Sequence, residues 1–160
     1  MILEIKSMNE EFAIEILDWK YEPPYDFYNN ESDPQSLKEL MENSYYVVVD
    51  NNKKIVGYFC IGDSAKVPIG VQFGAYNEEL IDIGIGMNPS LTGKGYGATF
   101  FSFILSFIEE NFLRVPFRLT VAKFNQRAIH LYEKFGFEKE MEFDRGDTRF
   151  MTMVRGCSFT

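Results

Sequence analysis

The chain has 160 residues, of which 46% are hydrophobic, which suits a single domain spanning residues 1–160 with its own core. Its formal net charge of −8 argues against nucleic-acid binding, because that binding depends on a basic surface. With no apolar run long enough to cross a membrane, no signal peptide and no metal or disulfide pattern around Cys60 and Cys157, we expect a cytoplasmic, metal-free protein with reduced thiols.

Hydrophobic periodicity predicts a mixed α/β sheet. Apolar residues at every second position predict strands, and apolar residues three and four positions apart predict helices. In chain order we expect a strand at residues 2–6, a helix capped by Asn9 or Ser7 that ends between Trp19 and Pro23, a short helix that begins at Asp33-Pro34, strands at 45–49 and 55–61 around a hairpin turn, a strand at 80–87, a helix at 97–112, a strand at 117–122, a helix capped by Asn125, and strands at 138–143 and 148–154. The resulting order is βααβββαβαββ.

Two connections are unusual. Residues 19–30 are rich in aromatic and acidic side chains, so they either pack on the core as a loop or form an aromatic, acidic wall for an amine substrate. The substrate-binding candidates in this segment are Tyr21, Tyr25, Asp26 and Tyr28. The connection at residues 62–77 is long enough to be functional, and part of it is expected to extend a hairpin. If both segments are functional, the substrate is expected between them.

The helix expected at residues 97–112 is apolar nearly all round, so we expect it to be buried on more than one face. A partner subunit or a neighbouring loop would cover the second face, which suggests a homodimer. The net negative charge suits a cationic amine substrate, and it serves equally well to maintain solubility.

A glycine-rich turn at residues 91–98 joins the apolar strand to this helix. Glycines permit positive φ and close approach, and the first N–H groups of a helix attract anions, so this turn predicts a phosphate site. A Walker loop is excluded because Asn88 stands where its first glycine is required. The spacing of Gly93, Gly95 and Gly97 also differs from that of a dinucleotide-binding loop.

The turn at residues 92–98, Thr-Gly-Lys-Gly-Tyr-Gly-Ala, resembles the coenzyme A pyrophosphate loop of the GNAT superfamily of N-acetyltransferases. Residues 125–137 resemble the second signature of that family, with Asn, Ala, Tyr and then Phe-Gly-Phe. The resemblance covers the element order of the whole chain. It implies a mixed, mostly antiparallel sheet with a splayed middle and helices on both faces, and acetyl-CoA as cofactor.

The resemblance also implies which residues bind the cofactor. They are Ile85, Met87, Thr92, Gly93, Lys94, Gly95, Tyr96, Gly97, Ala98, Asn125, Ala128 and Tyr132. The backbone of the central strand would hold the pantetheine arm, and Gly84 and Gly86 make a bulge plausible there. The chain departs from the family at Thr92, where Gln or Arg is usual. Thr92 would offer a hydroxyl to the phosphate without a charge, so Lys94 and the loop amides would carry more of the binding.

For catalysis, the resemblance makes Tyr132 the general acid toward the thiolate, although its position also fits a core tyrosine. Asp82 is a candidate general base because an acid within an apolar strand is costly unless it is paired or functional. Glu79 competes for that role, and Asp82 would otherwise only accept hydrogen bonds. A backbone N–H near Ile85 would stabilise the oxyanion.

The function expected from the resemblance is an N-acetyltransferase. It would move an acetyl group from acetyl-CoA to a primary amine of a small molecule or peptide by direct attack. The alternative is a catalytically inactive CoA-binding sensor or interaction module.

Overall fold

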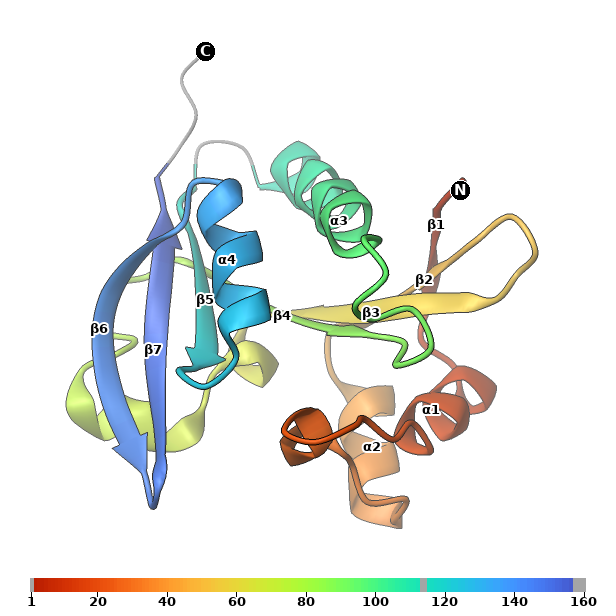
Figure 1. The fold of residues 1–160 in the computed structure, drawn as a ribbon, viewed down its shortest axis with the longest axis horizontal. Coiled ribbons are helices and arrows are strands. Elements are labelled where there is room, and N and C mark those ends of the chain that lie inside the picture. Colours follow the sequence, from red (N-terminus) through yellow and green to blue (C-terminus); the bar gives the residue numbers. More distant parts are fainter. Residues whose placement is uncertain (1, 113–114, 157–160) are drawn as a thin grey trace. The chain divides into compact units, whose positions relative to one another are not determined.

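The computed structural model describes residues 2–112 and 115–156, so Cys157 lies outside the described residues. The helices and strands are β1 (Glu4–Ser7), α1 (Glu10–Leu17), α2 (Pro34–Glu42), β2 (Tyr45–Val49), β3 (Ile55–Ile61), β4 (Ile81–Met87), α3 (Gly97–Asn111), β5 (Phe117–Ala122), α4 (Gln126–Lys134), β6 (Glu138–Arg145) and β7 (Thr148–Arg155), with short 3₁₀ helices η1 (Tyr25–Tyr28), η2 (Asp63–Ala65) and η3 (Pro68–Phe73) (Figure 1). This order confirms the predicted βααβββαβαββ sequence of elements.

The strands form one seven-stranded mixed sheet in the order β1-β2-β3-β4-β5-β7-β6. The pairing of β4 with β5 is parallel, whereas β1 with β2, β2 with β3, β5 with β7 and β6 with β7 are antiparallel. The predicted mixed, mostly antiparallel sheet is therefore confirmed. The chain divides into two compact units, with unit 1 formed by Met1–Cys60 and Ile85–Phe103 and unit 2 by Ile61–Gly84 and Ile104–Thr160.

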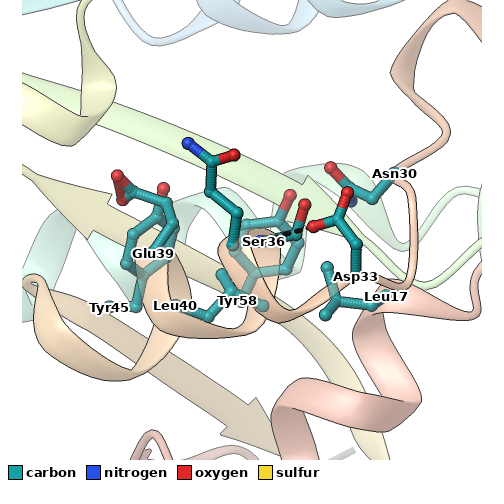
Figure 2. A pocket seen from close by; sticks show the side chains of 9 residues that line it. Leu17, Asn30, Asp33, Ser36, Glu39, Leu40, Tyr45 and Tyr58 are labelled. Carbon is teal, nitrogen blue, oxygen red and sulfur yellow. Dashed lines mark hydrogen bonds between the residues drawn. The ribbon is translucent and has the colours of Figure 1, made fainter.

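In unit 1, α1 and α2 pack on one face of the strands. Their buried residues and those of the strands beneath them form one cluster: Ala13, Ile16, Leu17, Leu40, Val47, Val49 and Ile55. Asn9 caps α1 by accepting a hydrogen bond from the Phe12 N–H at 2.8 Å, as predicted. Asp33 caps α2 in the same way through the Ser36 N–H at 2.7 Å (Figure 2). α1 ends at Leu17, earlier than the sequence pattern predicts.

A bulge in β3 changes which side chains face α1 and α2. Val48 pairs with Gly57 and Val49 pairs with Ile55, so Val56 is the extra residue. An extra residue reverses the alternation of side chains along a strand. As a result Ile55 and Tyr58, three positions apart, both pack with the cluster under the two helices.

α3 has one buried side and one polar stripe. Its buried residues are Phe100, Phe101, Ile104, Leu105 and Ile108. Its exposed residues include Thr99, Ser102, Ser106 and Glu109. α3 therefore carries a polar stripe that the prediction of an almost fully apolar helix missed, and the homodimer stays a prediction. Within the described residues, no helix combines the length and the apolar character that spanning a membrane requires.

In unit 2, the long connection at residues 62–77 contains η2 and η3 and does not extend a hairpin as expected. It packs by aromatic contacts against β6 and β7. Phe73 stacks on Phe143 at a centroid distance of 6.3 Å, and Phe143 stacks on Phe150 at 5.7 Å. The Tyr76 hydroxyl accepts a hydrogen bond from the Val67 N–H at 2.9 Å and so fixes the start of η3.

A buried ion pair joins β4 to β5. Asp82 and Arg118 are direct partners in the parallel register, and their side chains are 3% and 1% exposed. Arg118 donates from Nε to Oδ1 of Asp82 at 2.7 Å and from Nη2 to Oδ2 at 2.8 Å. Its Nη1 donates to the Glu78 carbonyl at 3.1 Å, and its guanidinium lies 5.0 Å from the centre of the Tyr76 ring. All three guanidinium nitrogens are therefore engaged.

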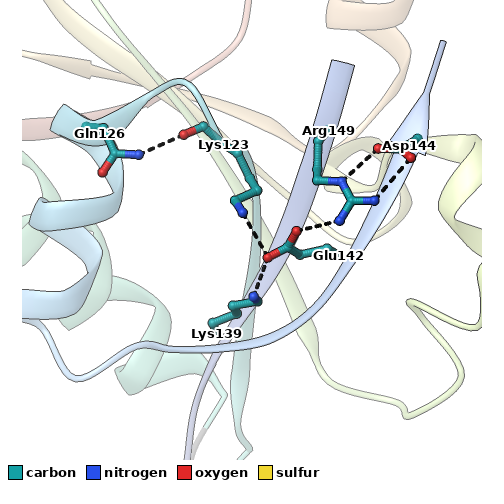
Figure 3. Close-up of polar contacts among 6 residues, drawn as sticks. All are labelled: Lys123, Gln126, Lys139, Glu142, Asp144 and Arg149. Atoms are coloured by element: carbon teal, nitrogen blue, oxygen red, sulfur yellow. Dashed lines mark hydrogen bonds and ion pairs between the residues drawn. The ribbon is translucent and has the colours of Figure 1, made fainter. Parts of the chain in front are cut away.

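A second charged cluster lies on the outer strands of unit 2 (Figure 3). Glu142 accepts from Lys139, from Arg149 at 2.8 Å and from Lys123 at 3.1 Å. Arg149 also pairs with Asp144 at 2.9 Å. Hydrogen bonds from Lys139, Arg149 and Lys123, in that order, lower the pKa of Glu142 from 4.5 to about 2.

The Asp82–Arg118 pair yields a first prediction. Arg118→Met should lower the free energy of unfolding by about 3–5 kcal/mol, because it leaves the Asp82 carboxylate buried without its partner. The double variant Asp82→Leu with Arg118→Met should be clearly more stable than this single variant, because no charge is then stranded. Urea unfolding followed by circular dichroism measures both. Equal losses in the single and double variants would contradict this account.

The Glu142 cluster yields a second prediction, on acid stability. Since the pKa of Glu142 is about 2 in the folded protein and 4.5 ordinarily, its stabilising contribution is complete above pH 4.5 and is lost as the pH falls toward 2. Glu142→Gln should therefore unfold more easily than the wild type at pH 7, and the difference should shrink between pH 4.5 and pH 2. Glu138→Gln, an exposed change on the same strand, is the control in urea titrations at each pH. A difference that does not depend on pH would exclude this role for Glu142.

Candidate functional site

The second half of β4 presents its backbone on the edge opposite β3. The Gly62 N–H donates to the Asp82 carbonyl at 2.9 Å, and the Asn88 N–H donates to the Val56 carbonyl at 2.9 Å. Even-numbered residues of β4 therefore turn their backbone groups toward β3, and odd-numbered residues such as Ile85 and Met87 turn theirs away. Asp82 and Asn88 are both even-numbered, so regular alternation along β4 turns both toward β3 without a bulge between them.

The parallel register of β4 with β5 runs only from Ile81 to Ile83. Ile85 and Met87 lie beyond it, on the part of β4 that belongs to unit 1. A strand edge of this kind can pair with an extended ligand. The sequence predicted these two residues as the backbone partners of the pantetheine arm, and their position fits that prediction.

Gly86, between them, is required by packing. A Cβ added there would lie 2.3 Å from the Tyr58 ring and 2.7 Å from its hydroxyl oxygen. Gly86 does not have a positive φ. Gly86 was expected to allow a bulge, whereas in the structure it allows the close approach of Tyr58.

The glycine turn leads from β4 into α3 and is exposed. Gly93 and Gly95 have φ angles of 74° and 86°, which side-chain-bearing residues rarely adopt. α3 begins at Gly97, so its first N–H groups lie directly after the turn, and Lys94 is exposed beside them. Two left-handed glycines, an exposed cation and the N-terminus of a 15-residue helix make a suitable cradle for a diphosphate.

Thr92 has a different role from the one expected. Its hydroxyl donates a hydrogen bond to the Pro89 carbonyl at 3.0 Å and so closes the turn on itself. The hydroxyl hydrogen is therefore used within the turn, and the structure does not support Thr92 as a donor to phosphate. The remaining members of the predicted loop are exposed or half-buried: Gly93, Lys94, Gly95, Tyr96, Gly97 and Ala98.

Unit 2 holds the other predicted cofactor residues, on α4. The Asn125 side chain accepts a hydrogen bond from the Ala128 N–H at 3.1 Å, which caps the helix. Tyr132 is 6% exposed, and its ring centre is 6.3 Å from that of Phe137. Gly136 has a φ of 89° and ends the helix, as its position predicts.

The two acids proposed as general base differ sharply. Both carboxylate oxygens of Asp82 accept hydrogen bonds from Arg118 in a buried pair, so Asp82 is not positioned to accept a proton from a substrate. The structure gives Asp82 the paired role that explains an acid inside an apolar strand. Glu79, which precedes β4, is exposed.

The aromatic segment at residues 19–30 contacts the end of β4 through Tyr21. The Tyr21 hydroxyl donates to the Met87 carbonyl at 2.7 Å, and its N–H donates to the Asn29 side chain at 2.7 Å. Tyr25, Asp26 and Tyr28 belong to η1, which has no buried residue. Tyr21 therefore borders the end of β4, where Ile85 and Met87 are half-buried. The other three candidates lie on a short turn in which Asp26 is exposed.

A pocket of about 330 Å³ opens in unit 1 between α2 and the strands. Its lining residues are Leu17, Asn30, Asp33, Gln35, Ser36, Glu39, Leu40, Tyr45 and Tyr58 (Figure 2). None of the four substrate candidates from the sequence is among them. The spacing of Asp33 and Glu39 on α2 was visible in the sequence, but their approach to Tyr58 depends on the packing of α2 against β3.

The predicted residues therefore fall into two sets. Unit 1 contains the glycine turn, Ile85, Met87 and Tyr21, and unit 2 contains Glu79, Asp82, Asn125, Ala128 and Tyr132. Among the described residues, no group of three His, Cys, Asp or Glu side chains is placed to hold a metal ion.

Comparison with known proteins identifies the family of the chain. The model of the Acetyltransferase (GNAT) family matches residues 11–137. No curated protein sequence matches the chain.

Solved structures with the same fold include several acetyltransferases. The acetyltransferase (GNAT family) from Bacillus anthracis has a TM-score of 0.73 and 15% identity over 98% of this chain and 95% of its own. A chimera of the Vibrio cholerae spermidine N-acetyltransferase SpeG with hSSAT has a TM-score of 0.68 and 22% identity over 98% and 96%. An aminoglycoside acetyltransferase, AAC(6')-Ib, in complex with coenzyme A has a TM-score of 0.70 and 20% identity over 96% and 94%.

Coenzyme A, bound in that last structure, is the cofactor that the glycine turn predicts for this chain. Since the family model covers most of the sequence, the chain belongs to the GNAT family of acetyltransferases.

Proposed function

We propose that the chain is an N-acetyltransferase that moves an acetyl group from acetyl-CoA to a primary amine by direct attack. The observation that carries this proposal is the edge of β4. Its backbone at Ile85 and Met87 lies beyond the register with β5 and is followed at once by the exposed glycine turn and the N-terminus of α3. An extended arm can pair with the strand while its diphosphate lies on the turn.

The roles of the binding residues follow from this geometry. The amides of Gly93, Gly95 and the first turn of α3 hold the diphosphate, and Lys94 supplies the charge that Thr92 lacks. Tyr21 occupies the Met87 carbonyl, so the groups left for the pantetheine arm on this edge are the Met87 N–H and both backbone groups of Ile85.

The reaction needs two proton movements. The amine nitrogen forms a bond to the acetyl carbon, the carbon–sulfur bond breaks, the nitrogen loses a proton and the sulfur gains one. Tyr132 donates the proton to the sulfur and recovers one from solvent. Glu79, which is exposed, is the remaining acid to receive the amine proton directly or through water. A backbone N–H near Ile85 stabilises the developing oxyanion.

The proposal is tested by binding and turnover. Calorimetry should show saturable binding of CoA that weakens about tenfold in Lys94→Ala, because a charge-assisted contact to phosphate is lost. Lys54→Ala, which removes an exposed lysine from the β2–β3 turn, should leave binding unchanged. With acetyl-CoA and a panel of amines, free thiol should be released in an amine-dependent manner. Saturable CoA binding with no thiol release from any amine would identify a CoA-binding module that lacks transferase activity.

Tyr132→Phe provides a separate test of the acid. The variant should lower kcat by about 10²-fold, because the leaving sulfur loses its proton donor, while CoA affinity stays nearly constant. Tyr46→Phe is the matched control for loss of a hydroxyl. Tyr46 belongs to β2, and its ring stacks on Phe59 of β3. Thiol release under saturating acetyl-CoA measures both, and an unchanged kcat in Tyr132→Phe would remove this residue from the mechanism.

A further inference from the structure

The exposed segment that leads into β4 is held in place from β5. Glu78 and Glu79 are both exposed, yet the Glu78 carbonyl accepts a hydrogen bond from Nη1 of the buried Arg118 at 3.1 Å. The atoms from one Cα to the next across a peptide bond lie close to one plane. The plane that contains the Glu78 carbonyl therefore also contains the N–H and the Cα of Glu79. A bond to that carbonyl fixes the point from which the Glu79 side chain starts.

A second backbone contact follows two residues after Glu79. The Ile81 N–H donates to the Pro116 carbonyl at 3.0 Å, at the residue where the register of β4 with β5 begins. Glu79 and Leu80 thus lie between two hydrogen bonds, one to Arg118 and one to Pro116. Contacts on both sides remove backbone freedom that an exposed segment otherwise keeps.

Arg118 is a rigid support for the first of these contacts. Its Nε and Nη2 donate to the Asp82 carboxylate at 2.7 and 2.8 Å, which leaves Nη1 for the Glu78 carbonyl. The guanidinium lies 5.0 Å from the centre of the Tyr76 ring, and the Tyr76 hydroxyl is hydrogen-bonded to Thr120 of β5 at 2.8 Å. The donors of a guanidinium form a planar fork with fixed directions. Two nitrogens held by Asp82 therefore aim the third one at Glu78.

The third contact of Arg118 is not needed to satisfy the buried charges. The bidentate pair with Asp82 already neutralises the guanidinium, whereas the Nη1 bond goes to the backbone beside the acid assigned to the amine proton. A general base must lie within hydrogen-bond reach of the proton that it accepts, and a small misplacement lowers the rate strongly. A fixed backbone at Glu79 limits the positions that its flexible side chain can take.

We propose that Arg118 is a positioning residue for the reaction. Through the Glu78 carbonyl it holds the backbone of Glu79, so that the Glu79 carboxylate receives the proton of the amine. Asp82 contributes by orienting Arg118 and does not receive that proton itself. The role of Glu79 rests on the proposed acetyltransferase function, whereas the anchoring of its backbone rests on the contacts of Arg118 alone.

The first test is a double-mutant cycle on kcat, followed by thiol release under saturating acetyl-CoA with the amine that the wild type uses fastest. Glu79→Gln should lower kcat about 10²-fold, because the amine loses its base. Arg118→Lys keeps a positive charge beside Asp82 but lacks the planar fork, so it should lower kcat about tenfold. With both changes, the total loss should stay near about 10²-fold, because a base that is already misplaced contributes less.

A residue that serves only the stability of the fold would give losses that multiply, to about 10³-fold in the double variant. That result, or an unchanged kcat in Glu79→Gln, would contradict the positioning role. If Arg118→Lys does not fold, Asp82→Leu with Arg118→Met, which leaves no buried charge unpaired, takes its place in the cycle with the same expected outcome.

Arg149→Lys is the matched control for the loss of an arginine fork. Arg149 also uses all three guanidinium nitrogens, two on Asp144 at 2.9 and 3.2 Å and one on Glu142 at 2.8 Å. These partners are side chains of β6 and not the backbone before β4. Arg149→Lys should therefore leave kcat and the effect of Glu79→Gln unchanged.

Backbone ¹⁵N relaxation of the full chain separates the anchor from the reaction. The order parameter of the Glu79 amide should be about 0.85 in the wild type and fall toward about 0.6 in Arg118→Lys, while that of Ile129 in α4 stays constant. An unchanged value at Glu79 would overturn the anchor whatever the turnover. A fall at Glu79 without thiol release from any amine would support the anchor and overturn only the acetyltransferase proposal.

Discussion

The bidentate pair between Arg118 and Asp82 fixes the place where β4 and β5 run together. The two residues face each other in the parallel register, and both are almost completely buried. A buried guanidinium and carboxylate tolerate little displacement, because separating them would leave two desolvated charges without partners. The register of β4 with β5 ends one residue later, at Ile83. Ile85 and Met87 lie after this register, on the part of β4 that belongs to unit 1.

The glycines around this part of β4 meet three separate physical requirements. Gly93 and Gly95 adopt positive φ, and so turn the chain into α3. Gly86 has no such angle and is small because Tyr58 packs against it. Gly57 is small for a related reason, since a Cβ there would lie 2.4 Å from the Phe100 ring. Gly86 of β4 therefore makes room for Tyr58, and Gly57 of β3 makes room for the buried Phe100 of α3.

Features that depend on neighbouring residues could be predicted from the sequence. Asn9, Asp33 and Asn125 each cap a helix through an N–H three residues later; the sequence predicted Asp33 and Asn125, and offered Asn9 as an alternative to Ser7. Features that depend on distant partners could not. The partner of Asp82 lies 36 residues away. The sequence around Asp82 therefore shows only an acid inside an apolar strand, which made Asp82 a candidate general base. The bulge at Val56, which turns Tyr58 toward α2, likewise depends on pairing with β2 and not on local composition.

The proposed cofactor is a polyanion, although the chain as a whole is acidic. The exposed glycine turn presents helix N–H groups and Lys94 to this anion. The turn follows the end of β4, where the backbone of Ile85 and Met87 offers both N–H groups and carbonyls and Tyr21 donates to the Met87 carbonyl. A ligand that carries amide groups complements such a mixture of donors and acceptors, as the pantetheine arm does. The net charge of −8 therefore matters less than its distribution, because one lysine and a helix terminus can hold a polyanion on an acidic chain.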